Sequence, residues 1–284
     1  MKPTTPAHAP DGASGGRRFA FVGLLACSLA GNLFLAHQAL RQYKARTLQA
    51  LDPPPVTRFE NENRSLGPPA ADRVRLVYFG DSRIAEWDHP PEPGIAQSIN
   101  RGYPGDTTAT ALLRVRGDAL ALQPGVVVVE IGINDLKAIA VLPDRAADIV
   151  RLARRNVTSL VGVLRERGIE VVVLTIWPRG PVDLKRLPFW GARVDGAILD
   201  LNSYLVTLRG EGVTVVECDP ILSLQGRMDP RYARDTLHMN AAGYERLGAH
   251  LAPYLDTLLA RLAGRRPARS APAPAAGAAP TPAF

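Results

Sequence analysis

The chain has 284 residues and a formal net charge of +7 at pH 7, a length that accommodates one domain of about 200 residues with additional segments. Residues 1–50 carry six Lys or Arg and one acid, and residues 263–284 carry three Arg, which leaves 25 basic and 26 acidic residues in 51–262. The excess positive charge therefore belongs to the ends, where it favours contact with anionic lipid or another polyanion. A near-neutral middle without zinc-ligand spacing or a basic helix-turn-helix pattern argues against a nucleic-acid-binding core and predicts no metal site.

An uncharged apolar run covers residues 19–40, after Arg17, Arg18 and a Pro/Ala/Gly-rich leader (residues 1–16) that is expected to be disordered. At about 1.5 Å per residue this run can cross a bilayer, so residues 17–40 are predicted to be an uncleaved transmembrane signal anchor. Two alternatives stay open: a cleaved signal peptide, since Leu24–Cys27 resembles a lipoprotein processing site, and an amphipathic surface helix. Because a short leader usually stays in the cytoplasm, the remainder of the chain is expected in the periplasm or otherwise outside the cytoplasm.

Two further segments are expected to lie outside the folded domain. Residues 41–71 are polar and then proline-rich, which predicts a semi-rigid spacer away from a membrane. Residues 263–284 are rich in Ala and Pro and cannot build a core, so they are expected to be disordered. The folded domain is therefore predicted to span residues 72–262.

Within residues 72–262, short apolar runs alternate with segments of helical periodicity. Strands are expected at 74–79, 95–101, 126–131, 170–176 and 213–217. Helices are expected at 107–122, 146–167, 194–208 and from the N-cap residue Asn240 to about residue 262. This alternation is typical of a parallel sheet covered on both faces, so the predicted fold class is α/β, a three-layer α/β/α sandwich with a mostly parallel five-stranded sheet.

Polar residues follow the predicted strands at the points where the strands end. They form four blocks: Gly80-Asp81-Ser82, Asn100-Arg101-Gly102, Gly132-Ile133-Asn134-Asp135, and Asp235-Thr236-Leu237-His238 before the last helix. Because the carboxyl ends of parallel strands meet at one edge of a sheet, we expect these blocks to lie close together. They contain a hydroxyl, an imidazole, a carboxylate, a glycine amide and a carboxamide, which are the groups that serine acyl transfer requires.

The four blocks resemble those of the SGNH hydrolases, the GDSL esterase/lipase superfamily. The matching motifs are GDSR at 80–83, Gly102 in NRGYPGDT, GIND at 132–135 and DTLH at 235–238. They follow the family order and span essentially the whole predicted domain, although Arg83 stands where the name-giving motif has Leu. No GxSxG pattern is present, which argues against the nucleophile elbow of the ordinary α/β-hydrolases.

The resemblance implies a role for each matching residue. Ser82 would attack the ester carbonyl, His238 would carry its proton to the leaving alkoxide, and Asp235 would orient the imidazole. The oxyanion would be held by the backbone N–H groups of Ser82 and Gly102 and by the side-chain amide of Asn134. The resemblance implies neither a metal nor an organic cofactor.

Several other residues near these blocks are interpreted as structural. Asp81 and Asp135 are expected to be turn residues, and Glu130, at the end of a buried strand, is expected to pair with an Arg. His89 lies in a proline-rich turn, and His250 lies inside the last helix, so neither is favoured as the partner of Ser82.

The two cysteines, Cys27 and Cys218, are too few for a disulfide framework and are expected to be unpaired thiols. Two tryptophans follow the fourth predicted strand, Trp177 and Trp190. They are candidates for lining an acyl or sugar pocket, and covering the edge of the sheet is an equal alternative.

The sequence therefore predicts a membrane-anchored serine esterase that acts on an acetyl or short-chain ester through an acyl-serine intermediate. A lipid esterase or thioesterase, an O-acyltransferase acting on an envelope polysaccharide and a non-catalytic glycan-binding member are the alternatives, because a fold does not fix a function. The predicted partners are an acylated glycan or small acyl ester and the membrane, but no nucleic acid. The sequence does not indicate an oligomeric state.

Overall fold

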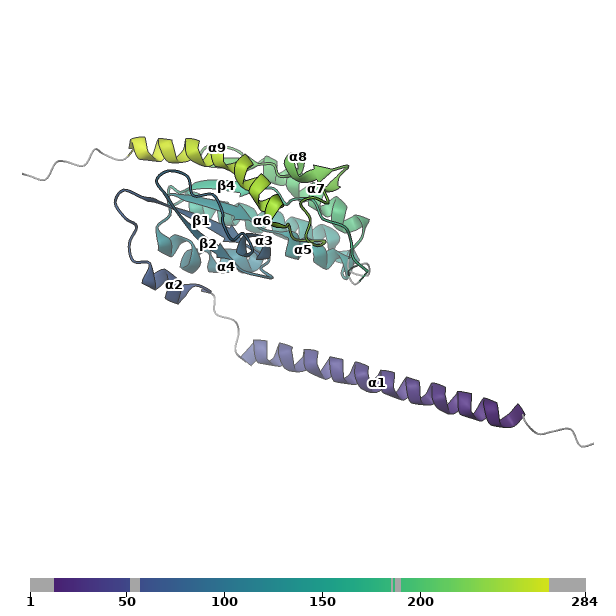
Figure 1. The fold of residues 1–284 in the computed structure, drawn as a ribbon. Helices are drawn as coiled ribbons and strands as arrows, with labels where there is room; N and C mark the ends of the chain where they lie inside the picture. The colour runs from purple at the N-terminus through teal and green to yellow at the C-terminus, as the bar shows by residue number, and fades with distance from the viewer. Residues whose placement is uncertain (1–12, 52–56, 185, 187–189, 266–284) are drawn as a thin grey trace, which may run out of the picture. The chain divides into compact units, whose positions relative to one another are not determined.

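The structure is a computed structural model that describes residues 13–51, 57–184, 186 and 190–265 (Figure 1). The chain divides into two compact units, residues 1–55 and residues 56–284. The described part of the first unit is a single helix, α1 (Ala13–Leu51). The second unit contains the sheet and all other helices of the described chain.

Helix α1 contains a segment, Phe19–Lys44, of 26 residues with a mean hydropathy of 2.0 and exposed side chains. By length and composition it can cross a membrane, and a signal sequence near an N-terminus has the same properties. The helix extends to Leu51, beyond the predicted start of the spacer at residue 41. The reason is that residues 41–51 contain neither Gly nor Pro, whereas prolines follow directly at 53–55.

A five-stranded parallel sheet forms the centre of the second unit. Its strands are β1 (Val74–Gly80), β2 (Ala96–Gly102), β3 (Val126–Glu130), β4 (Glu170–Leu174) and β5 (Val213–Val216). Their spatial order is β2-β1-β3-β4-β5, and every pairing is parallel. The predicted strands are confirmed, with ends that differ by at most two residues.

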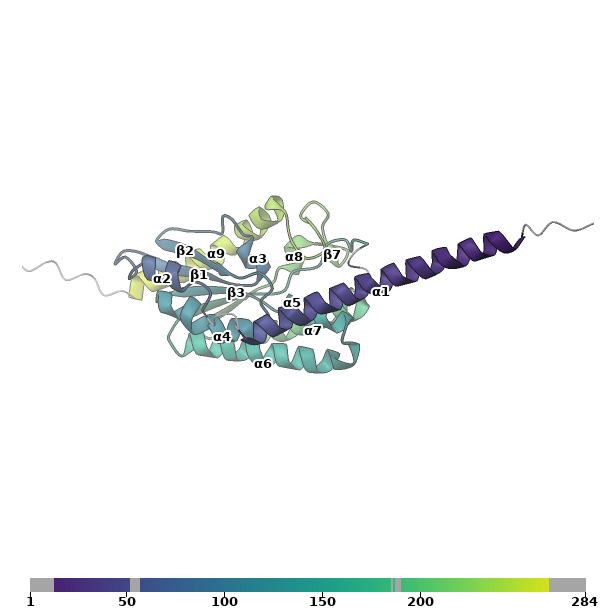
Figure 2. The same ribbon diagram turned by 90° about the horizontal axis from the view of Figure 1, so that it is seen from below.

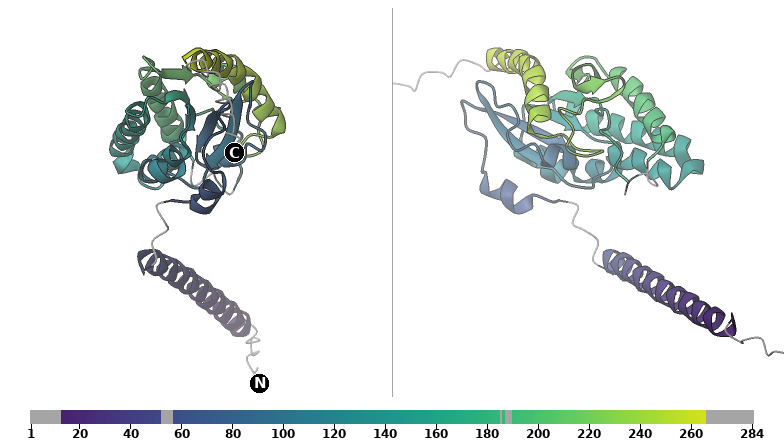
Figure 3. Two further views of the ribbon diagram at one scale, coloured as in Figure 1. Left: turned by 90° about the vertical axis from the view of Figure 1, so that its left-hand side faces the viewer. Right: turned by 45° about the vertical axis from the view of Figure 1, so that its right-hand side comes forward.

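Helices cover both faces of this sheet, as Figures 2 and 3 show. Alternate residues of β1 face opposite sides, so that Val77 and Phe79 enter one core while Leu76 and Tyr78 enter the other. The first core packs against α4 (Thr108–Asp118), α6 (Ala146–Arg165) and α7 (Ala192–Val206). The second packs against α9 (Ala241–Arg265). The predicted three-layer α/β/α class is confirmed.

Short elements connect these layers. They are α2 (Glu60–Ser65), α3 (Ser82–Ala85), η1 (Leu120–Leu122), α5 (Ile133–Leu136), η2 (Lys137–Ala140), η3 (Pro143–Arg145), α8 (Asp219–Leu222) and a hairpin of β6 (Ser223–Leu224) and β7 (Arg227–Met228). The last helix begins as predicted, because Asn240 Oδ1 accepts the N–H of Gly243 at 3.0 Å.

The spacer predicted for residues 41–71 also differs from the structure around α2, which packs on the domain. The N–H groups of Arg58 and Phe59 donate to the Asp118 carboxylate at 2.9 and 3.1 Å. Asn63 donates to the carbonyl of Gly117 at 2.9 Å and accepts from Arg101 Nε at 2.8 Å. Apolar contacts flank α2, since Leu66 packs against the core and the Phe59 ring lies 6.5 Å from that of Tyr103, but α2 itself has no buried residue. Hydrophobic periodicity therefore did not indicate this segment.

Candidate active site

Ser82 is the first residue of α3, directly after β1 has ended at Gly80. Asp81 caps this short helix, since its Oδ1 accepts the N–H of Arg83 at 2.9 Å. Gly80 permits the turn because a Cβ at this position would lie 2.8 Å from Ile84 Cγ1 and overlap the carbonyl of Glu130. As the first residue of a helix, Ser82 has a backbone N–H without an intrahelical acceptor.

The block that precedes α9 brings its histidine to Ser82, from 156 positions along the chain. Ser82 Oγ lies 3.0 Å from His238 Nε2, and His238 Nδ1 lies 2.9 Å from Asp235 Oδ2. A carboxylate beside Nδ1 favours the tautomer that carries its proton there. Nε2 is then an acceptor for the hydroxyl proton of Ser82, so the arrangement can deprotonate the serine.

Asp235 stays ionised over a wide pH range. Its Oδ1 accepts the N–H groups of Leu237 at 2.7 Å and His238 at 3.1 Å. Burial acts to raise the pKa of Asp235, but these backbone N–H groups and the His238 side chain outweigh burial and lower the pKa to about 2. The short DTLH block is thus a turn in which one carboxylate fixes both the backbone and the imidazole.

Asn134 lies in α5, just beyond the carboxyl end of β3, and is 8% exposed. Its Nδ2 donates to the carbonyl oxygen of Asp106 at 2.8 Å. The Asp106 side chain is in turn held by Arg114 in a buried ion pair, and Arg114 also donates to the Gly80 carbonyl at 2.8 Å. Because a carboxamide carries two N–H donors, Asn134 keeps one for another acceptor.

The N–H of Gly102 has another partner than the oxyanion that the resemblance implied for it. Its N–H donates to Asn100 Oδ1 at 2.9 Å, and the residue is buried where β2 meets α3. A Cβ at Gly102 would lie 2.6 Å from the Ala85 Cα, so close packing explains the glycine. Gly105, three residues later, is exposed, has φ of +86° and directly precedes Asp106, which contacts Asn134. The same sequence block thus contains a second glycine, and position within the block did not show which one lies beside Asn134.

The two acidic turn residues have structural partners. Asp135 accepts from the backbone N–H of Thr108 at 2.8 Å and from its hydroxyl at 2.7 Å, which ties α5 to the start of α4. Burial raises the pKa of Asp135. Asp81 is fully buried as the cap of α3, as described above. Neither carboxylate hydrogen-bonds to Ser82 or His238 in the described chain.

A buried cluster of charges lies beneath Ser82. Arg83 Nη1 is 3.2 Å from Glu130 Oε1, and both side chains are fully buried, so the predicted pairing of Glu130 with an Arg is confirmed. Arg83 Nε donates to the Leu237 carbonyl at 3.0 Å. Burial raises the pKa values of Glu130 and Asp81, because one guanidinium cannot compensate two carboxylates in a low-dielectric interior.

Trp177 and Trp190 separate into two environments. Trp177 is fully buried, with the Arg83 guanidinium 4.6 Å from its ring centroid, so the prediction that it lines a substrate pocket is wrong. Its Nε1 instead donates a long hydrogen bond of 3.4 Å to the Leu237 carbonyl. Trp190 lines a cavity together with Asn134, and its Nε1 donates to Asp195 Oδ1 at 2.9 Å.

The cavity shared by Asn134 and Trp190 has a volume of about 340 Å³ and is called here the Asn134 pocket. Its lining side chains are Asn134, Lys137, Ala138, Val141, Arg186 and Trp190. Three of these are apolar or aromatic, two are cationic, and one is the carboxamide described above. The pocket is therefore positioned to receive part of a molecule that reacts near Asn134.

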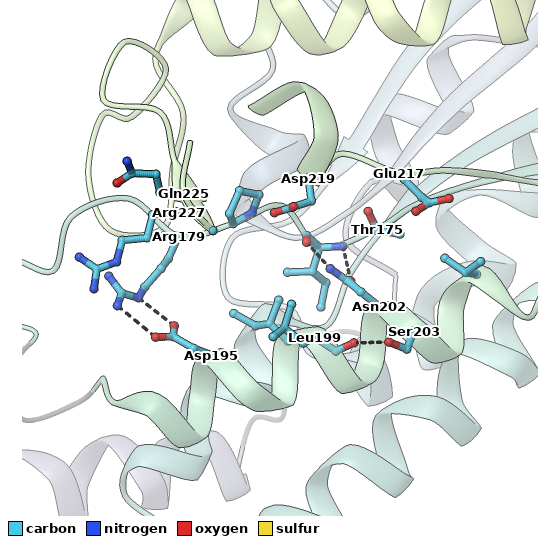
Figure 4. A pocket seen from close by; sticks show the side chains of 15 residues that line it. Thr175, Arg179, Asp195, Leu199, Asn202, Ser203, Glu217, Asp219, Gln225 and Arg227 are labelled. Carbon is cyan, nitrogen blue, oxygen red and sulfur yellow. Dashed lines mark hydrogen bonds and ion pairs between the residues drawn. The ribbon is translucent and has the colours of Figure 1, made fainter. Parts of the chain in front are cut away.

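A second cavity, of about 290 Å³, lies beyond the ends of β4 and β5 (Figure 4). In its wall, Arg179 donates two hydrogen bonds to Asp195, at 2.8 and 3.0 Å. The residue after Arg179 contacts the loop that carries Asp235 and His238, since the Gly180 N–H donates to the Thr236 carbonyl at 3.0 Å. None of Ser82, Asn134 and His238 lines this cavity, whereas Asn134 lines the other one.

Glu86 is a site residue that sequence reasoning missed. Its Oε1 lies 3.8 Å from His238 Nε2, and its Oε2 lies 2.8 Å from Arg234 Nη2. Glu86 is four residues after Ser82 and follows the single turn of α3. Residues four apart lie on the same side of a helix, so this spacing is the one signal in the sequence that could have indicated Glu86 as a neighbour of Ser82.

The remaining candidates are not near the reacting atoms. His89 is exposed, and His250 contacts the ring of Tyr254 at 5.7 Å between centroids. Cys218 is buried, which raises the pKa of its thiol, and both cysteines are free. Within residues 13–51, 57–184, 186 and 190–265, no group of three or more His, Cys, Asp or Glu could hold a metal ion.

The model of the GDSL-like Lipase/Acylhydrolase family matches residues 78–246, which include Ser82, Asn134, Asp235 and His238. The chain belongs to this family. It is therefore an acylhydrolase that acts on ester bonds, as the resemblance of the four blocks predicted. No curated protein matches this GDSL acylhydrolase.

Solved structures of other acylhydrolases share the fold of this GDSL acylhydrolase. A Bacteroides fragilis protein described as an acylhydrolase is 22% identical, with a TM-score of 0.57 over 71% of this chain and 96% of its own. A GDSL-like lipase from Bacteroides thetaiotaomicron is 21% identical, with a TM-score of 0.56 over 70% and 96%. The acetyl xylan esterase AlAXEase is 17% identical, with a TM-score of 0.53 over 64% and 100%.

Proposed function

We propose that this acylhydrolase is a membrane-anchored serine esterase that cleaves an acetyl or other short-chain ester through an acyl-serine intermediate. The single observation that carries the proposal is the hydrogen-bonded chain from Ser82 Oγ to His238 Nε2, at 3.0 Å, and from His238 Nδ1 to Asp235, at 2.9 Å. It joins a nucleophile, a base and a group that orients the base.

In the first half of the proposed reaction, Ser82 Oγ attacks the ester carbonyl while its proton passes to His238 Nε2. Negative charge then develops on the former carbonyl oxygen. The donors proposed to receive it are the Ser82 N–H, the free N–H of Asn134 Nδ2 and the N–H of Gly105. Collapse of the tetrahedral intermediate expels the alkoxide, which takes the proton from His238 and leaves an acyl-Ser82 ester.

In the second half, His238 removes a proton from water, and the resulting hydroxide attacks the acyl-Ser82 carbonyl. The same donors stabilise the second tetrahedral intermediate. Its collapse releases the carboxylic acid and returns the proton to Ser82 Oγ. Asp235 stabilises the imidazolium in both halves, and no residue of the chain is consumed.

The short acyl group is inferred from the lining of the Asn134 pocket. Its apolar wall is limited to Ala138, Val141 and Trp190, and two cations complete the lining. A long alkyl chain gains most from a continuous apolar tunnel, which this set of residues does not supply. The same fold holds deacetylation chemistry in AlAXEase, which is described as an acetyl xylan esterase.

A lipid esterase or thioesterase is the second candidate function. Val141, which lines the Asn134 pocket, has an exposed apolar side chain, as does the next residue, Leu142. Helix α1 contains a segment long enough to cross a membrane. An apolar rim on a membrane-bound enzyme favours access to lipid esters. An O-acyltransferase would use the same acyl-serine but pass the acyl group to a sugar hydroxyl instead of water.

The acyl preference is tested with the full chain in lipid nanodiscs and p-nitrophenyl esters of increasing chain length from C2 to C12. The proposal predicts a maximum of kcat/KM at C2, and a maximum at C8 or longer would instead support the lipid esterase. Adding a sugar acceptor separates hydrolysis from transfer. Hydrolysis gives free acid at an unchanged rate, whereas acylated sugar formed in preference to acid would support the transferase.

The anchor is proposed to be α1 itself, with residues 56–284 outside the cytoplasm. Its membrane-spanning length and its place near the N-terminus support this location, and a cleaved signal peptide is the alternative. The mature N-terminus of the protein in the membrane fraction decides between them. A chain that still begins ahead of Phe19 supports the anchor, and one that begins at Cys27 supports lipoprotein processing.

A further inference from the structure

The Asn134 pocket carries a cation beside the proposed oxyanion donors. Lys137 begins η2, directly after α5, and therefore lies three residues beyond Asn134 in a continuous pair of helical turns. This spacing places both side chains on one side of the segment, and both line the pocket. Lys137 also lies close enough to Asp81, the neighbour of Ser82, for its charge to lower the pKa of that carboxyl.

Lys137 has no ion-pair partner within the described part of the chain. The other cations around the triad are each paired: Arg83 with Glu130, Arg179 with Asp195, and Arg234 with Glu86. Burial lowers the pKa of Lys137, Asp81 opposes this effect, and the charge of Arg186 adds to it. An anion in the pocket would offset the desolvation of Lys137 and its repulsion by Arg186.

Arg186 is the second cation of the Asn134 pocket and is only loosely paired. Its Nε lies 3.6 Å from the carboxylate of Asp183, three residues earlier, and both side chains are more than one-third exposed. The lining of the pocket thus carries two cations and no carboxylate. The remaining wall, formed by Ala138, Val141 and Trp190, is apolar.

An acidic side chain lies near His238, outside the lining of the Asn134 pocket. Glu86 Oε1 is 3.8 Å from His238 Nε2, and its Oε2 is paired with Arg234 at 2.8 Å, whereas Lys137 and Arg186 line the pocket that contains Asn134. Because Arg234 offsets the charge of Glu86, the cations that can attract a negatively charged group are those of the Asn134 pocket. The lining therefore favours an orientation in which the anionic part of a substrate enters the Asn134 pocket.

On this basis we infer that the Asn134 pocket binds a carboxylate or phosphate group carried by the ester, so that the substrate class is an anionic ester. The anion lies between Lys137 and Arg186, and the aliphatic or ring part that joins it to the ester lies against Val141 and Trp190. This inference rests on the proposed esterase function and names its substrate class. The anion belongs either to the acyl part or to the alcohol part of the ester.

Matched ester pairs that differ by one charge test the inference with the full chain in neutral-lipid nanodiscs. For the alcohol part, 4-acetoxybenzoate is compared with its neutral methyl ester. For the acyl part, the p-nitrophenyl monoester of succinic acid is compared with its methyl-capped form. In at least one pair we expect kcat/KM to be about fivefold to tenfold higher for the anionic ester, the effect of a partly exposed charge contact. The pair that shows the preference identifies which part of the substrate enters the pocket.

Two variants assign the preference to the pocket. Lys137→Gln should bring the anionic-to-neutral ratio of kcat/KM close to one, and Lys137→Arg should keep it. Arg261→Gln removes the same charge at the opposite edge of the sheet, where Arg261 lies 4.0 Å from Glu170 at the start of β4, and should leave the ratio as in the wild type. Raising the salt from about 20 mM to about 500 mM should reduce the wild-type ratio.

A wild-type enzyme that hydrolyses the neutral esters but shows no preference in either pair would overturn the inference and leave the esterase proposal intact. A ratio that persists in Lys137→Gln would also overturn it, because the preference would then arise elsewhere. Failure to hydrolyse any of the four esters, with no labelling of Ser82 by a fluorophosphonate, would instead contradict the esterase proposal itself.

Discussion

The guanidinium of Arg83 donates from Nε to the carbonyl oxygen of Leu237 at 3.0 Å. The residue that follows the proposed nucleophile thus holds the loop that carries Asp235 and His238. Arg83 is itself fixed by Glu130 at 3.2 Å and by the face of Trp177. Where the name-giving motif of the family has Leu, this chain has an Arg that forms a buried ion pair and anchors the loop.

Removing either Arg83 or Glu130 should therefore lower both the stability and the activity of the protein. Arg83→Ala leaves Glu130 buried and uncompensated, and we expect the free energy of unfolding to fall by about 3–5 kcal/mol. Chemical denaturation followed by tryptophan fluorescence measures this change. The double variant Arg83→Leu with Glu130→Leu should regain most of the stability, because it removes both charges. A double variant less stable than Arg83→Ala would contradict this account of the pair.

Asn134→Ala tests the proposed oxyanion donor. We expect kcat to fall by about 10²–10³-fold, because the charge that develops in the transition state loses one donor. Asn156→Ala is the matched control, since the Asn156 carboxamide is also buried but donates to Thr108 Oγ1. It should lower stability without a comparable loss of kcat. Equal losses of kcat in both variants would assign Asn134 a structural role through Asp106.

Asp235 should make the stability of the domain depend on pH in the acid range. Its pKa is about 2 in the folded state against 3.8 in an unperturbed aspartate. Its stabilisation is therefore present above pH of about 4 and is lost as the pH falls towards 2. Asp235→Asn keeps the acceptor for the Leu237 N–H but removes this titration. Between pH 5 and pH 2 the wild type should lose about 1 kcal/mol more than the variant, allowing for solvent screening of this partly exposed group. Parallel pH curves for the two proteins would contradict the prediction.

The two glycines of the second block should respond differently to substitution. Gly102→Ala forces a Cβ into the backbone of Ala85, so we expect a loss of stability of about 3 kcal/mol or more. Gly105→Ala meets no atom within 4 Å but must keep φ of +86°, which costs about 1 kcal/mol. Thermal unfolding of both variants measures the difference. A Gly102→Ala enzyme with wild-type stability would remove the packing explanation for this glycine.

Hydrophobic runs and strand-end motifs were sufficient to predict the fold class, the five strands and the residues that meet at the sheet edge. The four valines at 126–129, for example, form a continuous apolar run because both faces of β3 are buried. The meeting of Ser82 with His238 followed from the rule that parallel strands end at one edge. These features depend on periodicity and order along the chain, which a sequence displays directly.

Features that depend on individual side-chain contacts were not predictable in this way. The docking of α2 rests on backbone N–H groups that reach Asp118, a contact between segments 60 residues apart. Trp177 is buried because Arg83 and Leu237 lie against it, and nothing in its own neighbourhood along the chain indicates this. Lys137 and Glu86 reach the site from the turns after Asn134 and Ser82, where charged residues are ordinarily surface residues.

The central claim, that Ser82 is the nucleophile activated by His238 and Asp235, is tested most directly by covalent labelling. The full chain is treated with a fluorophosphonate and digested, and the modified residue is identified by mass spectrometry. The account predicts one adduct, on Ser82, absent in Ser82→Ala and formed at least about 10³-fold more slowly in His238→Ala. An adduct on another residue, or a folded wild-type enzyme that hydrolyses esters without labelling at Ser82, would contradict it.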